Sequence, residues 1–498
     1  MKNIKSYLIF TLLGVLSVLG FAPFYIYPIP ILAIAILIFS IEESSNAKVA
    51  FKLSFAFGLG LFVAGIYWIF ICLHTFGKMP SWMAAIFTFL LCAFMALFIG
   101  LSGYIAKKLG HVFLAIPLLW ALGDWTRSWI FTGFPWLTLG YSQTPYSPLT
   151  GYTAVVGVYG VTLITVATSA LLAYTFLIKK NRKVMAIILS LFTMIWLVGG
   201  ALKWVEWSKP IGEKFSVALL QGNIAQDDKW LPENAQNTLD LYWSQLKSSN
   251  AKLIVMPETA LPIPFSQIPA EYLEALTKHA VMNNGDILVG VVDIQPQQYF
   301  NQVFSLGESS SQTYTKSHLV PFGEFIPLKQ VFGFFYRDFL NMPLADFSRG
   351  DIKQKPLNVA GQKVAVDICY EDVFGEEITR QLPAATILVN TSNDAWYGDS
   401  IAAYQHMQIS QTRALETARM MLRATNTGAT AIIDKDGIAL LHAPHFSQTV
   451  VEGVAQGYAG TTPYVRFGNW PMILISVIGL SLLCVYRLRR SSKSMIKA

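Results

Sequence analysis

Apolar residues form long runs along the first 205 residues and again near the end of the chain. Because a helix needs about 20 apolar residues to cross a lipid bilayer, this pattern predicts eight membrane spans. The second predicted span is short and contains Pro28 and Pro30, so taken alone it also fits a re-entrant segment. The predicted spans cover residues 7–24, 26–41, 53–74, 83–106, 112–131, 152–178, 184–205 and 470–487. We therefore expect an α-helical membrane bundle of seven spans over residues 1–205, and a last span with a basic tail over residues 467–498.

The pattern changes over residues 206–466, where short runs rich in β-branched residues alternate with helical stretches. Alternating strands and helices indicate a layered α/β domain, and about 260 residues are enough for one large domain. The predicted strands cover residues 215–224, 251–262, 286–294, 299–306, 312–320, 362–370, 385–392 and 422–434. The predicted helices cover residues 232–249, 270–284, 375–382 and 403–421.

Basic residues accumulate in every second loop between the predicted spans. Under the positive-inside rule these loops face the cytoplasm. Both termini then lie in the cytoplasm, and residues 206–466 lie on the opposite side, which in a bacterium is the periplasm. If the second segment did not span, the basic N-terminus would lie on the wrong side, so we count it as a span. The basic positions are Lys2, Lys5, Lys48, Lys52, Lys107, Lys108 and the stretches 179–183 and 487–490.

The composition supports a membrane protein. Only 13% of the 498 residues are charged and 53% are hydrophobic, whereas a soluble domain usually has about 25% charged residues. The net charge of +7 then reflects membrane topology, and we expect no nucleic-acid partner. Cys72, Cys92 and Cys484 fall in predicted spans, where we expect them to fill space. Cys369 is alone in the extramembrane domain, so we expect no internal disulfide there.

Three short blocks place ionisable residues after predicted strands. They are MPETALP with Glu258, YTKSHLVPFGEFIP with Lys316 and Glu324, and DICYEDVFGE with Cys369. Functional residues of α/β sheets gather at the carboxyl ends of strands. A cysteine nucleophile needs a base, and Glu258 could serve if burial raised its pKa. Lys316 could offset nearby carboxylates and stabilise an oxyanion.

Cys369 has an unusual local sequence, because Asp367, Glu371 and Asp372 are close to it. Negative charge disfavours the thiolate. In an ideal strand Asp367, Cys369 and Glu371 would share one face, so a reactive thiol requires a bend after Cys369. A lone strand cysteine is more often a core residue, and only the combination of the three blocks favours a nucleophile.

These blocks resemble a known superfamily. Glu258, Lys316 and Cys369 match the Glu–Lys–Cys triad of the nitrilase superfamily, whose domains are αββα sandwiches, and residues 390–398 and 413–437 are also similar to it. With a multispan bundle, and with the stretches 124–136 and 221–230, the chain resembles the bacterial apolipoprotein N-acyltransferases over nearly its full length.

The resemblance implies a two-step acyl transfer. Cys369 would attack the sn-1 ester of a phospholipid, typically phosphatidylethanolamine, to form a thioester. The α-amino group of the S-diacylglyceryl-cysteine of an apolipoprotein would then accept the acyl chain, which completes lipoprotein maturation. Glu258 would be the general base, and Lys316 with a backbone N–H would hold the oxyanion. The supporting or substrate-binding residues that the resemblance implies are Glu324, Tyr370, Glu371 and Trp230.

The resemblance also implies a location in the bacterial inner membrane, with the active site in the periplasm. We expect no cofactor and no metal, since the histidines, His318 and His406 among them, lack metal-ligand spacing. We expect a monomer that contacts membrane lipids. Two other functions stay open: a membrane-tethered amidase that uses water as the second nucleophile, and a transporter or scaffold with an inactive domain.

Two further features have alternative interpretations. Asp124 and Arg127, three residues apart in a predicted span, form either a structural salt bridge or, through Arg127, a contact with a lipid phosphate. The aromatic-rich segment 332–350 is a candidate lid, since two bulky lipids must enter in turn.

Overall fold

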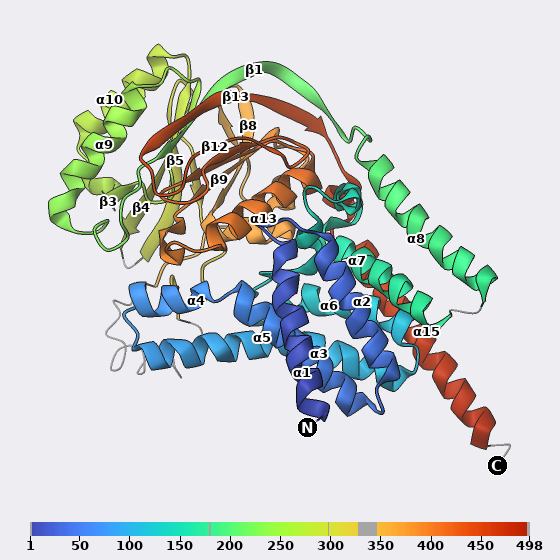
Figure 1. The fold of residues 1–498 in the computed structure, drawn as a ribbon. Helices are drawn as coiled ribbons and strands as arrows, with labels where there is room; N and C mark the ends of the chain where they lie inside the picture. The colour runs from blue at the N-terminus through green and yellow to red at the C-terminus, as the bar shows by residue number, and fades with distance from the viewer. Residues whose placement is uncertain (1, 179–180, 297, 327–345, 496–498) are drawn as a thin grey trace. The chain divides into compact units, whose positions relative to one another are not determined.

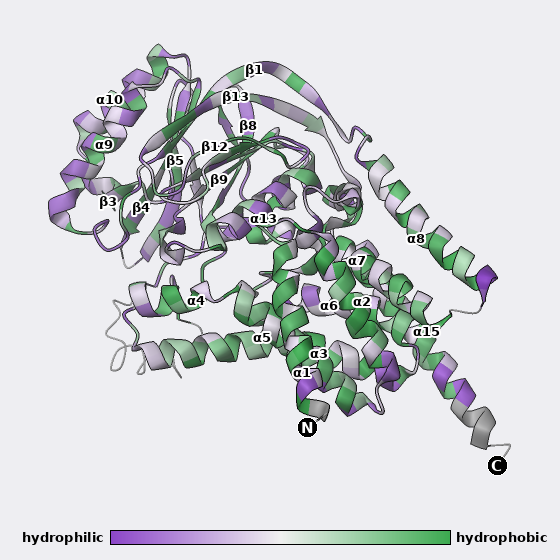
Figure 2. Ribbon diagram, in the orientation of Figure 1, coloured by the Kyte–Doolittle hydropathy of each residue, from purple (hydrophilic) through white to green (hydrophobic). Residues whose placement is uncertain are grey.

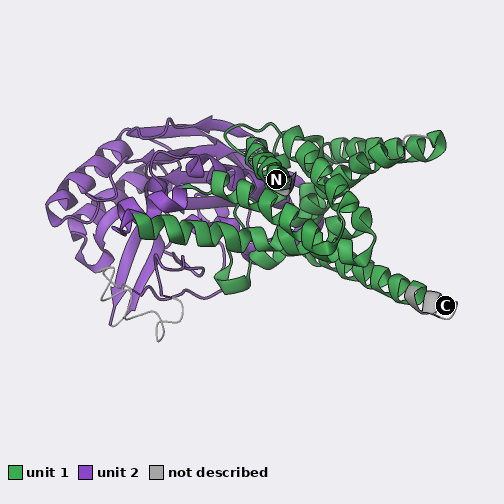
Figure 3. Cartoon of the chain, turned by 60° about the horizontal axis from the view of Figure 1, so that its bottom comes forward, with its two compact units in different colours: residues 1–67, 82–205, 466–498 green, residues 68–81, 206–465 purple. Residues whose placement is uncertain are grey.

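The computed structural model describes residues 2–178, 181–296, 298–326 and 346–495 (Figure 1). The chain divides into two units (Figure 3). The first comprises Met1–Tyr67, Trp82–Val205 and Arg466–Ala498, and the second comprises Trp68–Ser81 and Glu206–Val465.

The first unit is built from helices that are mostly apolar along their length (Figure 2). Among the described residues, five helical segments are long and apolar enough to span a membrane: Ala47–Gly65, Ser81–Leu109, Pro148–Leu177, Arg182–Leu202 and Trp470–Arg490. The other three predicted spans form helices of 16 residues each. A membrane protein with several apolar helices is therefore supported, and the count of eight spans stays a prediction. The main helices are α1 (Lys2–Ser17), α2 (Pro28–Glu43), α3 (Ala47–Gly65), α5 (Ser81–Leu109), α6 (Val112–Arg127), α7 (Thr153–Leu177), α8 (Arg182–Leu202) and α15 (Trp470–Met495).

Asp124 and Arg127 form a buried salt bridge in α6. Arg127 Nη2 lies 2.6 Å from Asp124 Oδ1, and both side chains are at most 3% exposed. Arg127 also donates to the Trp136 carbonyl, and Asp124 accepts from the Leu139 N–H and the Thr162 hydroxyl. The pair thus fixes the loop after α6. Of the two interpretations given above, the structure supports the salt bridge.

The predicted span over residues 53–74 is too long at its carboxyl end. Helix α3 ends at Gly65, and a short helix α4 (Trp68–Ile71) and a π-helical turn η2 (Cys72–Phe76) belong to the second unit. Trp68 Nε1 donates to Gln405 Oε1, and Cys72 Sγ donates to the Trp396 carbonyl. Cys72 therefore belongs to the second unit and lies beyond the helix Ala47–Gly65 that is long enough to span. Hydropathy alone misses this difference, because apolar residues that pack on protein resemble those that face lipid.

In its described residues, the second unit contains two β-sheets (Figure 1). The first has the order β13-β1-β2-β4-β5-β6, with β3 paired to β4, and the second has the order β12-β11-β10-β9-β8-β7. The central pairs β1–β2, β2–β4, β8–β9 and β9–β10 are parallel. The strands are β1 (Ser208–Gln221), β2 (Leu253–Val255), β3 (Leu261–Pro264), β4 (Asp286–Gln295), β5 (Gln298–Gly307), β6 (Thr313–Thr315), β7 (Leu357–Val359), β8 (Gln362–Ile368), β9 (Ile387–Ser392), β10 (Met421–Thr425), β11 (Ala431–Ile433), β12 (Ala439–His442) and β13 (Thr449–Gly460).

The two sheets pack face to face, and helices cover their outer faces. Alternate residues of each strand point to opposite faces, so Val217 and Leu219 of β1 join the core between the sheets, while Ala218 and Leu220 pack on helices. Helices α9 (Ala235–Lys247) and α10 (Ala270–Met282) cover the first sheet, and α12 (Gly375–Ile378) and α13 (Ala402–Thr417) cover the second. This arrangement confirms the expected αββα sandwich.

Two predicted elements end earlier than the sequence indicates. The strand predicted over residues 312–320 is only β6 (Thr313–Thr315), because the chain then turns to carry Lys316 inward. The helix predicted over residues 403–421 stops at Thr417, where Ala418 adopts a left-handed conformation with φ 52°. Both errors concern boundaries and not the type of element.

Candidate active site

Glu258 lies in the turn between β2 and β3, with its side chain buried. The turn packs directly on Gly290 of β4. A Cβ atom at Gly290 would lie 2.2 Å from the Pro257 carbonyl oxygen and 3.0 Å from the Glu258 Cα. Only glycine therefore allows the backbone of Glu258 to approach the sheet this closely.

Lys316 follows β6 and brings its ammonium between two carboxylates. Its side chain is 1% exposed, and Nζ lies 3.2 Å from Glu258 Oε1 and 2.8 Å from Glu324 Oε1. Asn301 of β5 bridges the same two carboxylates, since its Nδ2 donates to Glu258 Oε1 at 2.7 Å and to Glu324 Oε1 at 3.3 Å. Glu324 Oε2 also accepts the Val320 N–H. Lys316 and Glu324, which stand in one sequence block, thus meet Glu258 in one largely buried cluster.

Cys369 begins the turn η8 (Cys369–Val373) at the end of β8. Its backbone has φ 55°, in the left-handed region that costs free energy for any residue except glycine. The required bend is therefore present, and it turns the chain sharply at the candidate nucleophile. The thiol is buried close enough to Glu258, Lys316 and Asp394 for each of these charges to affect its pKa.

Glu371 ties the Cys369 turn to the Lys316 segment. Its Oε1 accepts from the Ser317 N–H, the Ser317 hydroxyl and the His318 N–H, and its Oε2 accepts from the Ile368 N–H and the Tyr314 hydroxyl. These five distances lie between 2.7 and 3.0 Å. Glu371 thus braces the residues next to Lys316 and next to Cys369.

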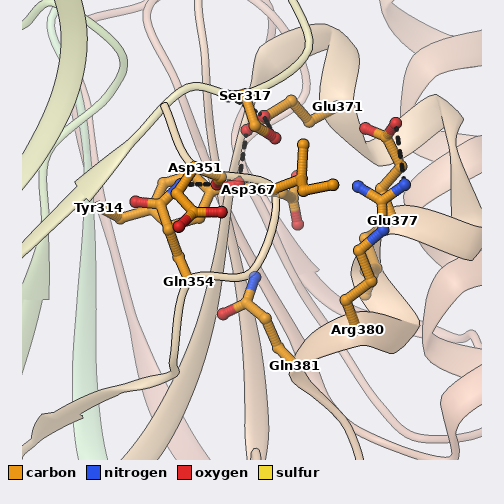
Figure 4. A pocket seen from close by; sticks show the side chains of 11 residues that line it. Tyr314, Ser317, Asp351, Gln354, Asp367, Glu371, Glu377, Arg380 and Gln381 are labelled. Carbon is orange, nitrogen blue, oxygen red and sulfur yellow. Dashed lines mark hydrogen bonds and ion pairs between the residues drawn. The ribbon is translucent and has the colours of Figure 1, made fainter. Parts of the chain in front are cut away.

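Figure 4 shows the carboxylate of Glu371 beside Ser317 in a small polar pocket that Tyr314, Asp367 and Gln381 also line. The three candidate triad residues do not line this pocket in the part of the chain that the structure describes. Asp367 accepts a hydrogen bond from Asn390 Nδ2, and burial raises the pKa of the Asp367 carboxyl well above the ordinary range. A carboxyl that keeps its proton adds no negative charge beside the thiol.

The charges of the cluster favour an ionised Glu258. Burial raises the pKa of Glu258, but the ammonium groups of Lys316 and Lys229 and the hydrogen bond from Asn301 outweigh burial and hold this pKa below its ordinary value. Burial alone lowers the pKa of Lys316, whereas Glu258 and Glu324 together raise it well above the usual range. Burial thus acts on the pKa of Glu258 in the expected direction, but the net shift is downward because two lysines face this carboxylate.

The thiol of Cys369 keeps its proton in this environment. Burial raises its pKa, and the negative charge of Glu258 raises it further, while Lys316 offsets only part of the effect. A neutral thiol beside an ionised carboxylate is the starting state for general-base catalysis, in which the proton leaves as the sulfur attacks.

Asp372, the remaining acidic residue beside Cys369 in sequence, belongs to a buried network around Arg423 and His406. Arg423 of β10 donates to Asp372 and Asp394, and His406 of α13 lies 2.8 Å from Asp372 and 2.9 Å from Asp394. Burial and Arg423 lower the pKa of His406, but the two aspartates raise it to about 9. Asp372 is thus neutralised by cations, which explains how an acidic sequence can surround the thiol.

The other residues named from the sequence, Tyr370, Trp230 and His318, differ from one another in burial and contacts. Tyr370 is buried and packs edge-to-face against Phe374, whereas Trp230 is 47% exposed at the end of the loop after β1. His318 stacks on Phe374 at 3.8 Å between ring centroids. The candidate lid 332–350 lies mostly outside the described residues.

Three residues of the cluster were not found from the sequence: Lys229, Asn301 and Asn393. Asn393 donates its backbone N–H to Glu258 Oε2 at 3.0 Å, and Lys229 donates to the carbonyl of Glu258 at 3.1 Å. Asn393 lies within the stretch 390–398 and Lys229 within 221–230, both of which resemble family segments. A lysine and an asparagine in loops carry no signal of burial, so only the fold reveals them.

Comparison with known proteins identifies both halves of the chain. Residues 13–171 match a family model described as the apolipoprotein N-acyltransferase N-terminal domain, and residues 216–464 match the carbon-nitrogen hydrolase model. Three relatives named apolipoprotein N-acyltransferase cover nearly the whole chain. The protein from Nitrosomonas europaea is 49% identical over 95% of this chain and 95% of its own length. The protein from Chromobacterium violaceum is 41% identical over 93% and 90%, and that from Methylococcus capsulatus is 39% identical over 97% and 96%. The chain therefore belongs to the apolipoprotein N-acyltransferase family.

Proposed function

We propose that this protein transfers an acyl chain from a membrane phospholipid to the N-terminal S-diacylglyceryl-cysteine of lipoproteins. The observation that carries the proposal is the buried cluster in which Glu258 accepts hydrogen bonds from Lys316, Asn301 and the Asn393 N–H beside the Cys369 thiol. Glu258 is the general base, Lys316 is the oxyanion donor and Cys369 is the nucleophile.

In the first step the Cys369 sulfur attacks the ester carbonyl, and the thiol proton moves to Glu258. A carbon–sulfur bond forms and the ester carbon–oxygen bond breaks. The departing lysophospholipid oxygen takes the proton from Glu258. Lys316, fixed by two carboxylates, supplies positive charge to the carbonyl oxygen as negative charge develops there.

In the second step the α-amino group of the lipoprotein attacks the thioester. Glu258 takes a proton from the amine, the carbon–nitrogen bond forms and the carbon–sulfur bond breaks. The proton then returns to the Cys369 sulfur. The thioester keeps the acyl group activated, so the reaction needs neither ATP nor coenzyme A.

The apolar helices support lipid substrates. Moving an acyl chain into water costs about 0.8 kcal/mol per CH₂, and an enzyme held in the membrane can bind lipids without exposing their chains. We propose the bacterial inner membrane as the location, with the catalytic unit in the periplasm and both termini in the cytoplasm. Phosphatidylethanolamine is the proposed donor, a diacylated apolipoprotein is the acceptor, and the protein acts as a monomer. Glu324, Glu371 and Tyr370 support the site, and Trp230 contacts substrate at the entrance.

The test is to incubate the purified protein with phosphatidylethanolamine and a synthetic diacylated lipopeptide, and to analyse both products by mass spectrometry. We expect the lipopeptide to gain one acyl chain as an amide. Release of free fatty acid with an unchanged lipopeptide would favour a hydrolase. Equal lipopeptide acylation by Cys369→Ala would exclude Cys369 as the nucleophile, and no acylation by the wild-type protein would favour a role as a transporter or scaffold.

A further inference from the structure

Lys229 is a second buried lysine next to Glu258. It lies in the loop 222–231 after β1, and only 1% of its surface is exposed. Its Nζ donates to the Thr259 hydroxyl at 2.6 Å and to the Glu258 carbonyl at 3.1 Å. Thr259 has φ 45°, a conformation that surrounding contacts must hold in place. Lys229 therefore supports the backbone that carries the candidate base.

The charges around Lys229 belong to the catalytic cluster. Burying an ammonium is unfavourable unless it has polar and charged partners. The ionisable groups that act on Lys229 are Glu258 and Cys369, and Lys316 is the other ammonium that acts on Glu258. Burial lowers the pKa of Lys229 to about 8, although Glu258 and Cys369 both raise it. Lys229 in turn lowers the pKa of Glu258.

The same loop also reaches the carboxylate of Glu258. Gln226 accepts a hydrogen bond from Asn393 Nδ2 at 2.7 Å, and the Asn393 N–H donates to Glu258 Oε2. The loop 222–231 is thus connected to the backbone of Glu258 through Lys229 and to its carboxylate through Gln226 and Asn393. Trp230, the half-exposed aromatic at the proposed entrance, is the residue next to Lys229.

We propose that Lys229 is a positioning residue for the general base, whose ammonium holds the Glu258 turn in place and keeps the Glu258 carboxylate ionised until it accepts the Cys369 proton. This inference rests on the proposed role of Glu258 as base. It adds a second cation to the Glu–Lys–Cys arrangement, and this cation acts through Glu258 without contact with the reacting atoms.

The charge and the hydrogen bonds of Lys229 can be separated by substitution. Lys229→Gln keeps N–H donors and loses the charge, and Lys229→Met loses both. Thr259→Val keeps the ammonium and removes one acceptor. Lys278→Met, which breaks an exposed ion pair with Glu274, is a matched control for the loss of one lysine.

The primary readout is the pH dependence of alkylation of Cys369 by iodoacetamide, measured by mass spectrometry on the peptide that contains this residue. Below the pKa of Glu258 the base is protonated and the rate of Cys369 alkylation falls. This fall is the acid limb of the pH–rate profile. A neighbouring charge typically shifts a carboxyl pKa by about one unit or more. We therefore expect the acid limb to move up by at least about one pH unit in Lys229→Gln and Lys229→Met, so that the rate on this limb falls about tenfold. Thr259→Val and Lys278→Met should keep the wild-type limb.

A wild-type acid limb in Lys229→Gln would overturn the proposal. The proposal would also fail if Lys229 acted only in folding. Both Lys229 variants would then lose thermal stability, while the protein that stays folded would keep the wild-type acid limb. Acyl-enzyme formation from phospholipid, measured in parallel, separates this inference from the proposed function. If the alkylation limb moves but wild-type protein forms no acyl-enzyme, the acyltransferase proposal fails and the role of Lys229 stands.

Discussion

Glu371 gives the sharpest test of how the site is held together. Its carboxylate accepts five hydrogen bonds, three from backbone N–H groups of Ser317, His318 and Ile368. The substitution Glu371→Gln changes no more than one oxygen to an NH₂ group, so the shape of the side chain is kept. The NH₂ group donates and cannot accept, and every orientation of the amide therefore leaves at least one buried N–H without an acceptor.

The two orientations differ in cost. If the amide nitrogen replaces Oε2, the Ile368 N–H loses its acceptor, while the Tyr314 hydroxyl can rotate and accept. If the amide nitrogen replaces Oε1, the N–H groups of Ser317 and His318 both lose their acceptor. The first orientation leaves one unpaired donor, which costs about 1–3 kcal/mol, and weakens the remaining bonds because the charge is gone. A total near 2–4 kcal/mol corresponds to a fall in melting temperature of roughly 5–15 °C for a domain of this size.

The assay is thermal unfolding of the purified protein in detergent, together with the rate of acyl-enzyme formation. We expect the rate for Glu371→Gln to fall at least about tenfold, because Glu371 fixes the residues beside Lys316 and Cys369. Glu376→Gln, at an exposed position on α12, is the matched control. A melting temperature within 2 °C of this control, or an unchanged rate, would refute the reasoning.

Three further predictions follow from the buried contacts. Asn301→Leu removes hydrogen bonds to both carboxylates, so the acid limb of the reaction should move to higher pH with an unchanged KM; an unmoved limb would contradict this role. Arg423→Met leaves Asp372 and Asp394 without their guanidinium and should destabilise the unit by about 3–5 kcal/mol in denaturant unfolding; a loss below about 1 kcal/mol would argue against it. The raised pKa of His406, about 9, means that its stabilisation is complete below about pH 6.5 and is lost as the pH rises through 9. The melting temperature should fall over this range in wild type and less steeply in His406→Gln; parallel curves would exclude this effect.

Much of the fold could be predicted from the sequence because each pattern has one strong physical cause. Runs of apolar residues and alternating strands and helices follow from burial, so the helical unit and the αββα sandwich were both expected. The boundary at residue 65 was missed because Trp68 and Cys72 are as apolar as lipid-facing residues, yet they form hydrogen bonds within the second unit. The early end of β6 was missed because tertiary contacts, and not propensity, turn the chain at Lys316.

Only those residues of the candidate site that stand in recognisable sequence motifs could be predicted. Glu258, Lys316 and Cys369 stand in recognisable blocks, and the structure brings them into one cluster. The net direction of the Glu258 pKa shift was not foreseen, because it depends first on Lys316 and then on Lys229, which contact Glu258 across 58 and 29 positions of sequence. Such a contact is a property of the folded chain, and no local pattern reports it.

The most direct test is to look for the acyl group on Cys369 itself. Protein incubated with a phospholipid of defined chain length is digested, and the peptide that contains Cys369 is weighed before and after treatment with neutral hydroxylamine, which cleaves thioesters. We predict a mass increase of one acyl chain that hydroxylamine removes, and that a diacylated lipopeptide also removes as it becomes acylated. An unmodified Cys369 peptide in protein that still acylates the lipopeptide would contradict the account.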